Sequence, residues 1–126
     1  MTGTPRFTLA TVVLDCRDAH ALAGFYRRLL GWEFTAQEPD WVLLRDPAGG
    51  VGIAVQGEEW YEPPRWPEEP GAQRKMLHLD IRVDELEPAV RHAVALGARE
   101  ADVQFHDDVR VLLDPAGHPF CLFTDA

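Results

Sequence analysis

The sequence has no excess of positive charge, with lysine at a single position, and it has no long apolar segment. Each of these two shortages excludes a class of protein. Its 126 residues include 12 Lys plus Arg against 21 Asp plus Glu, which gives a net charge of −9. Nucleic acids and anionic membrane surfaces attract cationic proteins, so we expect neither partner. No apolar run approaches the ~18 residues of a membrane span, and the first residues lack the apolar core of a secretion signal. These absences predict a cytoplasmic protein.

Sequence patterns of familiar catalytic sites are missing as well. Cys16 and Cys121 stand alone, without CxxC or Cys/His spacing, and in a reducing compartment we expect two free thiols. The GxSxG, P-loop and GxGxxG patterns are absent. Hydrophobic residues make up 46% of the chain, and a chain of this length buries roughly two-thirds of its surface on folding. We therefore expect a single domain, residues 1–126. Its negative net charge suits a neutral or cationic small molecule as the ligand.

An internal repeat is the strongest pattern in the chain. The tetrapeptide Asp-Pro-Ala-Gly occurs at 46–49 and again at 114–117, an offset of 68 residues. A Leu-Gly pair at 30–31 recurs at 96–97, and apolar runs flank both tetrapeptides. Glycine commonly ends a helix, and a Pro/Gly turn between two apolar runs indicates a β-hairpin. The same features in the same order predict a duplicated module.

Each half of the chain is predicted to form the order βαβββ. Apolar residues recur with helical spacing over 19–30, and Asp18 is a suitable N-cap for that helix. Asp84 has the same place before a helix over 85–96. The expected strands cover residues 7–16, 32–38, 41–45 and 51–56 in the first half, and 76–83, 101–105, 109–113 and 119–123 in the second.

The segment 57–74 between the two halves is rich in proline, acids and aromatic residues. It holds four prolines and five acids together with Trp60, Tyr61 and Trp66. Tryptophan side chains are costly to leave in water. We therefore expect this loop to dock on its own domain, on a second subunit or on a ligand, and the sequence leaves the three alternatives open.

Three motifs resemble those of the vicinal oxygen chelate (VOC) superfamily, most closely its small glyoxalase-like and bleomycin-resistance-type proteins. They are Phe-Tyr-Arg-Arg-Leu-Leu-Gly-Trp at 25–32, the two Asp-Pro-Ala-Gly turns, and His-Leu-Asp-Ile-Arg-Val-Asp at 78–84. The resemblance extends over residues 7–123. It implies an α+β fold in which two tandem βαβββ modules, residues 6–56 and 75–126, form a curved sheet around a cleft. It also implies a homodimer, because many relatives dimerise.

The resemblance further identifies four positions at which the superfamily's enzymes hold a divalent metal, one in the first and one in the last strand of each module. In this sequence they are Thr11, Ile53, His78 and Cys121, with Val55 in place of Ile53 if that strand is shifted by two residues. Isoleucine has no ligand atom and threonine is a weak neutral ligand, whereas protein metal sites use carboxylates, imidazoles and thiolates. We therefore expect no metal and no cofactor.

His78 is the candidate for catalysis. Strand side chains alternate between faces, so His78 and Asp80 are expected to share a polar face that lines the cleft, unless these polar side chains simply pair with each other. An imidazole without a metal is a donor, an acceptor or a weak base. Cys121 is expected to be a small buried filler, and the histidines at 20, 92, 106 and 118 to be solvated.

Aromatic side chains indicate the kind of ligand. Trp41, Trp60 and Trp66 suit stacking with an aromatic or cationic compound, or else a dimer seam. The predicted ligand-binding residues are Thr11, Trp41, Ile53, Trp60, Trp66, His78, Asp80 and Cys121. Together these features favour a metal-independent protein that sequesters or carries a small compound. One alternative is an isomerase or glyoxalase-like lyase with His78 as acid or base, and another is a regulatory module that binds a partner protein through the Pro-rich loop.

Overall fold

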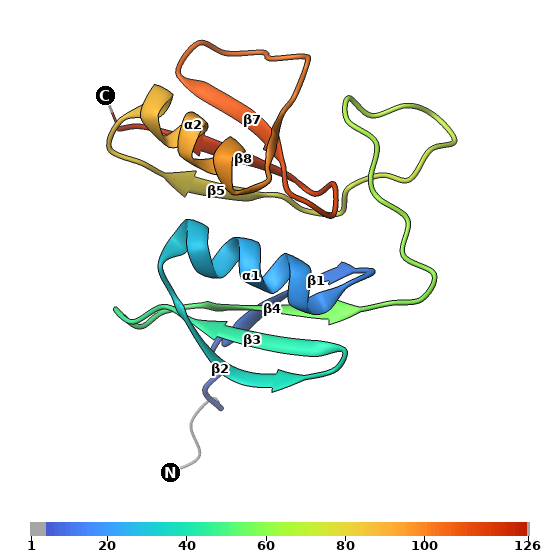
Figure 1. The fold of residues 1–126 in the computed structure, drawn as a ribbon, viewed down its shortest axis with the longest axis vertical. Coiled ribbons are helices and arrows are strands. Elements are labelled where there is room, and N and C mark those ends of the chain that lie inside the picture. The colour runs from blue at the N-terminus through green and yellow to red at the C-terminus, as the bar shows by residue number, and fades with distance from the viewer. Residues whose placement is uncertain (1–4, 126) are drawn as a thin grey trace.

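The computed structural model describes residues 5–125 and contains two modules of the order βαβββ (Figure 1). The first consists of β1 (Thr11–Cys16), α1 (Ala19–Leu30), β2 (Glu33–Glu38), β3 (Trp41–Arg45) and β4 (Gly52–Gly57). The second consists of β5 (Leu79–Arg82), α2 (Leu86–Leu96), β6 (Arg99–Glu100), β7 (Val109–Leu113) and β8 (Pro119–Phe123). The predicted α+β fold with two similar modules is confirmed.

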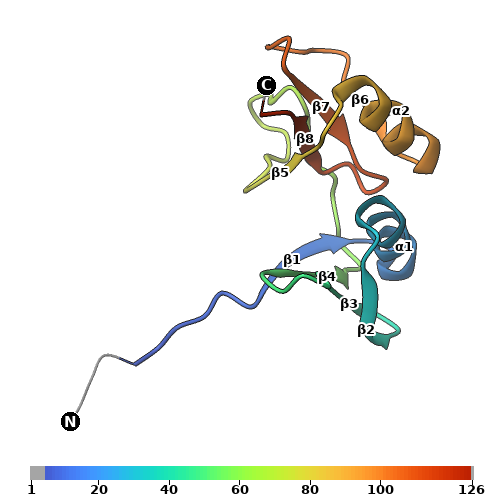
Figure 2. The same ribbon diagram turned by 90° about the vertical axis from the view of Figure 1, so that its left-hand side faces the viewer.

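Each module forms its own four-stranded sheet with its first strand at an edge. The strand orders are β1-β4-β3-β2 and β5-β8-β7-β6. The first strand pairs in parallel with the last, because the helix supplies the crossover that a parallel pair requires. The two sheets are separate rather than continuous, and their edge strands β1 and β5 lie at the junction of the modules (Figure 2).

The two helices lie on the same side of the molecule and contact each other (Figure 2). Each helix packs on one face of its own sheet, and we call the opposite face, which neither helix covers, the open face. Phe25 and Tyr26 of α1 meet Phe120 of β8, with ring centroids 6.1 and 6.5 Å apart, and all three side chains are buried. One hydrophobic core therefore joins the two modules.

The ends of α1 agree with the prediction, and the start of α2 does not. The Asp18 carboxylate accepts a hydrogen bond from the amide of Ala21 at 3.1 Å, and Gly31 ends the helix with φ of 72°. Asp84 was expected to cap α2, but its carboxylate accepts from the neighbouring Glu85 amide at 2.9 Å instead. The helix therefore begins one residue later, with Glu85 at the cap and no side-chain capping bond.

The strand predicted over 101–105 is displaced to Arg99–Glu100 and has two residues, and two other predicted strands are shorter than expected. Residues 101–105 form no strand, because the side-chain amide of Gln104 bonds both the N–H and the C=O of Val111, at 2.8 and 2.9 Å. This side chain occupies the edge of β7 where a neighbouring strand would pair. The strands predicted over 7–16 and 76–83 are reduced to Thr11–Cys16 and Leu79–Arg82. Among residues 5–125, no helix has the length and apolar character that crossing a membrane requires.

Candidate functional site

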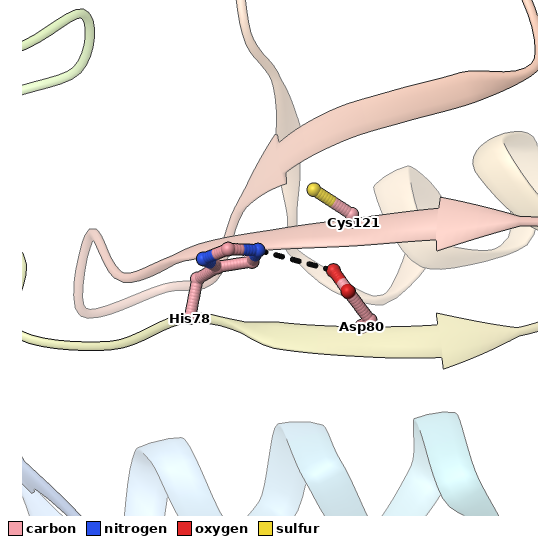
Figure 3. A group of neighbouring side chains, drawn as sticks. All are labelled: His78, Asp80 and Cys121. Atoms are coloured by element: carbon pink, nitrogen blue, oxygen red, sulfur yellow. Dashed lines mark ion pairs between the residues drawn. The ribbon is translucent and has the colours of Figure 1, made fainter.

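Three side chains form a cluster on the second sheet: His78, Asp80 and Cys121 (Figure 3). Asp80 in β5 and Cys121 in β8 are register partners. Leu79 and Ile81 pack against the hydrophobic core, so strand alternation turns His78 and Asp80 to the open face. Nε2 of His78 lies 3.1 Å from Oδ1 of Asp80, and the ligand-type atoms of all three residues lie within 4.8 Å of one another. The structure thus brings three of the predicted site residues together.

The cluster retains access to solvent, but its thiol is protonated. His78 exposes 41% of its side chain and Asp80 exposes 60%. Burial, followed by the charge and hydrogen bond of Asp80, raises the pKa of the Cys121 thiol, so this sulfur is no nucleophile at neutral pH. The carboxylate beside the imidazole fixes the orientation of the ring and suits it to proton transfer. The cluster can therefore support acid–base chemistry or hydrogen bonding to a ligand.

The first module places other residues at the matching positions. In the pair of β1 and β4, Val12 is the partner of Ile53 and Val13 is the partner of Ala54. Ile53 is buried in the core, so it points to the helix side of the sheet. The open face carries Thr11 and Ala54. Ala54 is therefore the residue that matches Cys121, and the prediction of Ile53 at that position is wrong by one residue.

The difference comes from the two repeated turns. β4 begins six residues after Asp46, whereas β8 begins five residues after Asp114. The first turn contains two successive left-handed glycines, Gly49 and Gly50, with φ of 86° and 105°, where the second has only Gly117, with φ of 92°. The extra glycine lengthens the first turn by one residue and reverses which side chains of β4 face the core. Counting from identical tetrapeptides could not detect this shift.

The four-ligand metal site that the resemblance implies does not fit these residues. The first module offers the neutral hydroxyl of Thr11 and the methyl group of Ala54, and neither is an effective ligand. His78, Asp80 and Cys121 lie close enough to share one ion, but the thiol would first have to lose its proton. The donor set therefore lacks the half that the first module supplies in the superfamily's metal enzymes.

The three candidate tryptophans do not share one cavity in the described part of the chain. Trp41 lines a hollow at one end of the first sheet, and Trp60 is 87% exposed. Trp66 packs edge-on against Phe105, with ring centroids 5.9 Å apart, and the Lys75 ammonium lies 5.0 Å from its ring. The expected aromatic wall is not assembled, and Trp66 docks the inter-module loop on its own domain.

A second polar cluster, which sequence reasoning missed, joins this loop to the second Asp-Pro-Ala-Gly turn. The buried Asp114 carboxylate accepts from the Tyr26 hydroxyl at 2.6 Å and lies 2.8 Å from Nδ1 of His118. Nε2 of His118 lies 3.3 Å from the Tyr61 hydroxyl, which donates to the Ala116 carbonyl at 2.8 Å. His118 exposes only 17% of its side chain, so the prediction that it is solvated is wrong.

The polar groups of this second cluster form hydrogen bonds with one another, so the cluster stabilises the fold. Burial, followed by the charge of Asp114, raises the pKa of Tyr26 and of Tyr61, so both hydroxyls remain protonated at neutral pH. The sequence held one signal for the cluster. The residue after the Asp-Pro-Ala-Gly tetrapeptide is Gly50 in the first module and His118 in the second, and this change of residue type distinguishes the two repeats.

Comparison with known proteins agrees with this geometry. A family model described as a glyoxalase-like domain matches residues 11–123. A glyoxalase/bleomycin resistance protein/dioxygenase family enzyme from Burkholderia phytofirmans PsJN is 22% identical with a TM-score of 0.74, covering 95% of this chain and 100% of that one. A glyoxalase-related enzyme from Fulvimarina pelagi is 20% identical with a TM-score of 0.67, covering 94% and 88%.

A third similar structure is a glyoxalase/bleomycin resistance protein from Albidiferax ferrireducens T118, 16% identical with a TM-score of 0.65, covering 93% and 98%. No curated protein matches the sequence. At these identities the solved structures establish a common fold. The family model spans nearly the whole chain, and the chain therefore belongs to the glyoxalase-like domain family.

Proposed function

We propose that this chain binds a small molecule on its open sheet face, around His78, Asp80 and Cys121, without a four-ligand metal site. The supporting observation is the exposed His78–Asp80 pair, whose polar atoms lie 3.1 Å apart. An exposed ion pair contributes little to stability, unlike the buried network around Asp114. The imidazole and the carboxylate are therefore available to orient a ligand.

An aromatic or cationic compound suits the charge of this site. The chain has a net charge of −9. The Asp80 carboxylate stands beside a protonated thiol, and the Lys75 ammonium, whose charge also acts on that thiol, is paired with Glu68 at 2.9 Å. Two of the similar structures bear bleomycin resistance in their names. The role that we propose is to sequester or carry such a compound.

We place this binding protein in the cytoplasm as a homodimer. Phe7 and Leu9 in the segment before β1, and Met76 in the segment before β5, are large apolar side chains exposed to solvent. A second copy that covered them would remove apolar surface from water. Light scattering at about 50 μM should give the mass of two chains, well within the range in which a stable dimer is populated.

The geometry of His78 favours a second candidate function, an isomerase or glyoxalase-like lyase with this residue as general acid or base. Asp80 lies beside Nε2, which leaves Nδ1 free to face a substrate. A ring held in this way can move a proton to or from a small metabolite. This alternative uses the same site, so it differs from the first only in turnover.

A thermal-shift screen of metabolites and antibiotics, with and without divalent metals, tests the binding proposal. Calorimetry with the compound found should show about tenfold weaker binding to His78→Ala, as expected for one lost hydrogen bond to a charged group. His92→Ala, which changes an exposed histidine of α2, is the matched control and should bind normally. Turnover that vanishes in His78→Ala while binding persists would favour the enzyme, and equal binding by both variants would contradict the site.

A further inference from the structure

The junction of the two modules contains a cavity that shares Asp80 with the cluster on the open sheet face. Its volume is about 340 Å³. β1 and β5 are edge strands, each paired with a single neighbour in the described sheets, so they do not pair with each other and side chains line the space between them. Val12 and Ile53 of the first module and Leu79 and Ile81 of the second line this space, with Trp32 beyond the end of α1.

The wall of this cavity is apolar. Four of the side chains just named are branched aliphatic, and the fifth is an indole. Val12, Trp32, Leu79 and Ile81 pack against the core but remain only partly buried, which leaves apolar surface to be covered. A polar group placed inside would lose its water without gaining a partner. The occupant should therefore be apolar where it enters the cavity.

Two charged residues, Asp80 and Arg82, line the cavity. They alternate along β5 with Leu79 and Ile81, which pack against the core, so their side chains stand at the rim and not in the apolar wall. The Arg82 guanidinium is paired with Asp125 at 3.0 Å. Asp80 has the imidazole of His78 and the protonated thiol of Cys121 beside it, and the imidazole is charged only when protonated. The Lys75 ammonium, whose charge also acts on Cys121, is paired with Glu68 at 2.9 Å. Each of the two fixed cations thus has its own carboxylate, and with a neutral imidazole the charge that remains at Asp80 is negative.

We infer that this cavity receives the apolar ring of an amine whose ammonium group lies at Asp80. The inference deepens the proposed function and rests on it, because Asp80 belongs both to the rim and to the cluster with His78. A cavity of about 150 Å³ is enough to hold benzene, so this one accommodates a phenyl ring with a short alkyl chain. A carboxylate of the same shape would meet a like charge at the rim.

Phenethylamine and hydrocinnamate test the inference, because they share a phenyl ring and a two-carbon chain but carry opposite charges. In a methyl NMR titration of the unaltered protein, phenethylamine should shift the resonances of Val12, Ile53 and Ile81. It should bind about fivefold more tightly than hydrocinnamate, as expected for one exposed charge pair. This preference should shrink in high salt and disappear in Asp80→Asn. Equal binding of the two compounds, or shifts confined to other methyl groups, would overturn the inference.

Adjacent residues of β1 provide matched variants. Val12 lines the cavity, whereas Val13 lies on the open face. Val12→Phe fills part of the cavity and should weaken phenethylamine binding about tenfold, while Val13→Phe should not. The reverse pattern would overturn the cavity and leave the open-face function standing. The methyl titration uses the unaltered protein, so a total absence of shifts would refute the inference even if Val12→Phe failed to fold. The thermal-shift screen of metabolites and antibiotics tests the proposed function separately.

Discussion

Replacing Asp114 with alanine should destabilise the fold far more than the same change at Asp46, its counterpart in the first module. The Asp114 carboxylate accepts from the Tyr26 hydroxyl at 2.6 Å and from the backbone amides of Ala116 and His118 at 2.9 and 3.0 Å. It also lies 2.8 Å from the His118 ring. Alanine would leave the fully buried Tyr26 hydroxyl and half-buried donors without partners.

The expected magnitude follows from these contacts. A buried polar group left without a partner costs about 1–3 kcal/mol, and bonds to a charged group are worth about 1.5–3 kcal/mol each. Loss of the tyrosine bond together with the turn amides should therefore lower the free energy of unfolding by about 3–5 kcal/mol. The free energy of unfolding of a small domain falls by about 1–3 kcal/mol for each 1 M of urea, so the urea concentration at the midpoint of unfolding should fall by about 2 M.

Asp46→Ala is the matched control. Among residues 5–125, the Asp46 carboxylate accepts only from the exposed amide of Ala48, at 2.9 Å, so its loss should cost about 0.5–1 kcal/mol. Urea unfolding followed by circular dichroism measures both variants, and Tyr26→Phe should lie between them. If Asp114→Ala were no less stable than Asp46→Ala, the buried network would contribute nothing to stability, which would contradict this prediction.

Three further outcomes are expected. Elemental analysis of the purified protein should find no stoichiometric metal, because His78 lacks ligands from the first module, and one tightly held ion per chain would contradict this. Burial raises the pKa of Cys16 to about 11 and raises that of Cys121. Both thiols should therefore react more slowly with iodoacetamide at about pH 8 than free cysteine does. Labelling at the rate of free cysteine would refute this prediction. Because the pKa values of Tyr26 and Tyr61 are raised, the folded chain keeps protons that the unfolded chain loses above about pH 10, and urea stability should decline there. A stability that stays level to about pH 11 would oppose this reasoning.

Local chemistry made much of the fold predictable. Helix α1 has the predicted bounds because a capping carboxylate, Asp18, and a left-handed glycine, Gly31, act within a few residues of the helix ends. β3, β7 and β8 also have the predicted bounds. The strand expected over 101–105 failed because one side chain, Gln104, satisfies the edge of β7, which propensity cannot reveal.

The candidate site was likewise predictable only where local patterns determine it. His78 and Asp80 stand two residues apart on one strand, so alternation predicted their common face. Cys121 was placed by counting from a turn, and the same count failed for Ala54 because of one additional glycine. The contact between Tyr61 and His118 spans 57 residues and depends on how the loop crosses between modules, which no local pattern encodes.

The bond between Tyr26 and Asp114 spans 88 residues and links one repeat to the other. Two repeats that each satisfied their own buried polar groups could fold autonomously, yet here each half supplies a partner for a buried polar group of the other. Closing so long a loop costs conformational entropy, so this bond should form late in folding, and the chain should unfold in one cooperative transition. Cutting the chain within the loop should give two fragments that regain the native core only by reassociating. A single module of this kind could give its buried polar group a partner from another module only by pairing with a second copy of itself.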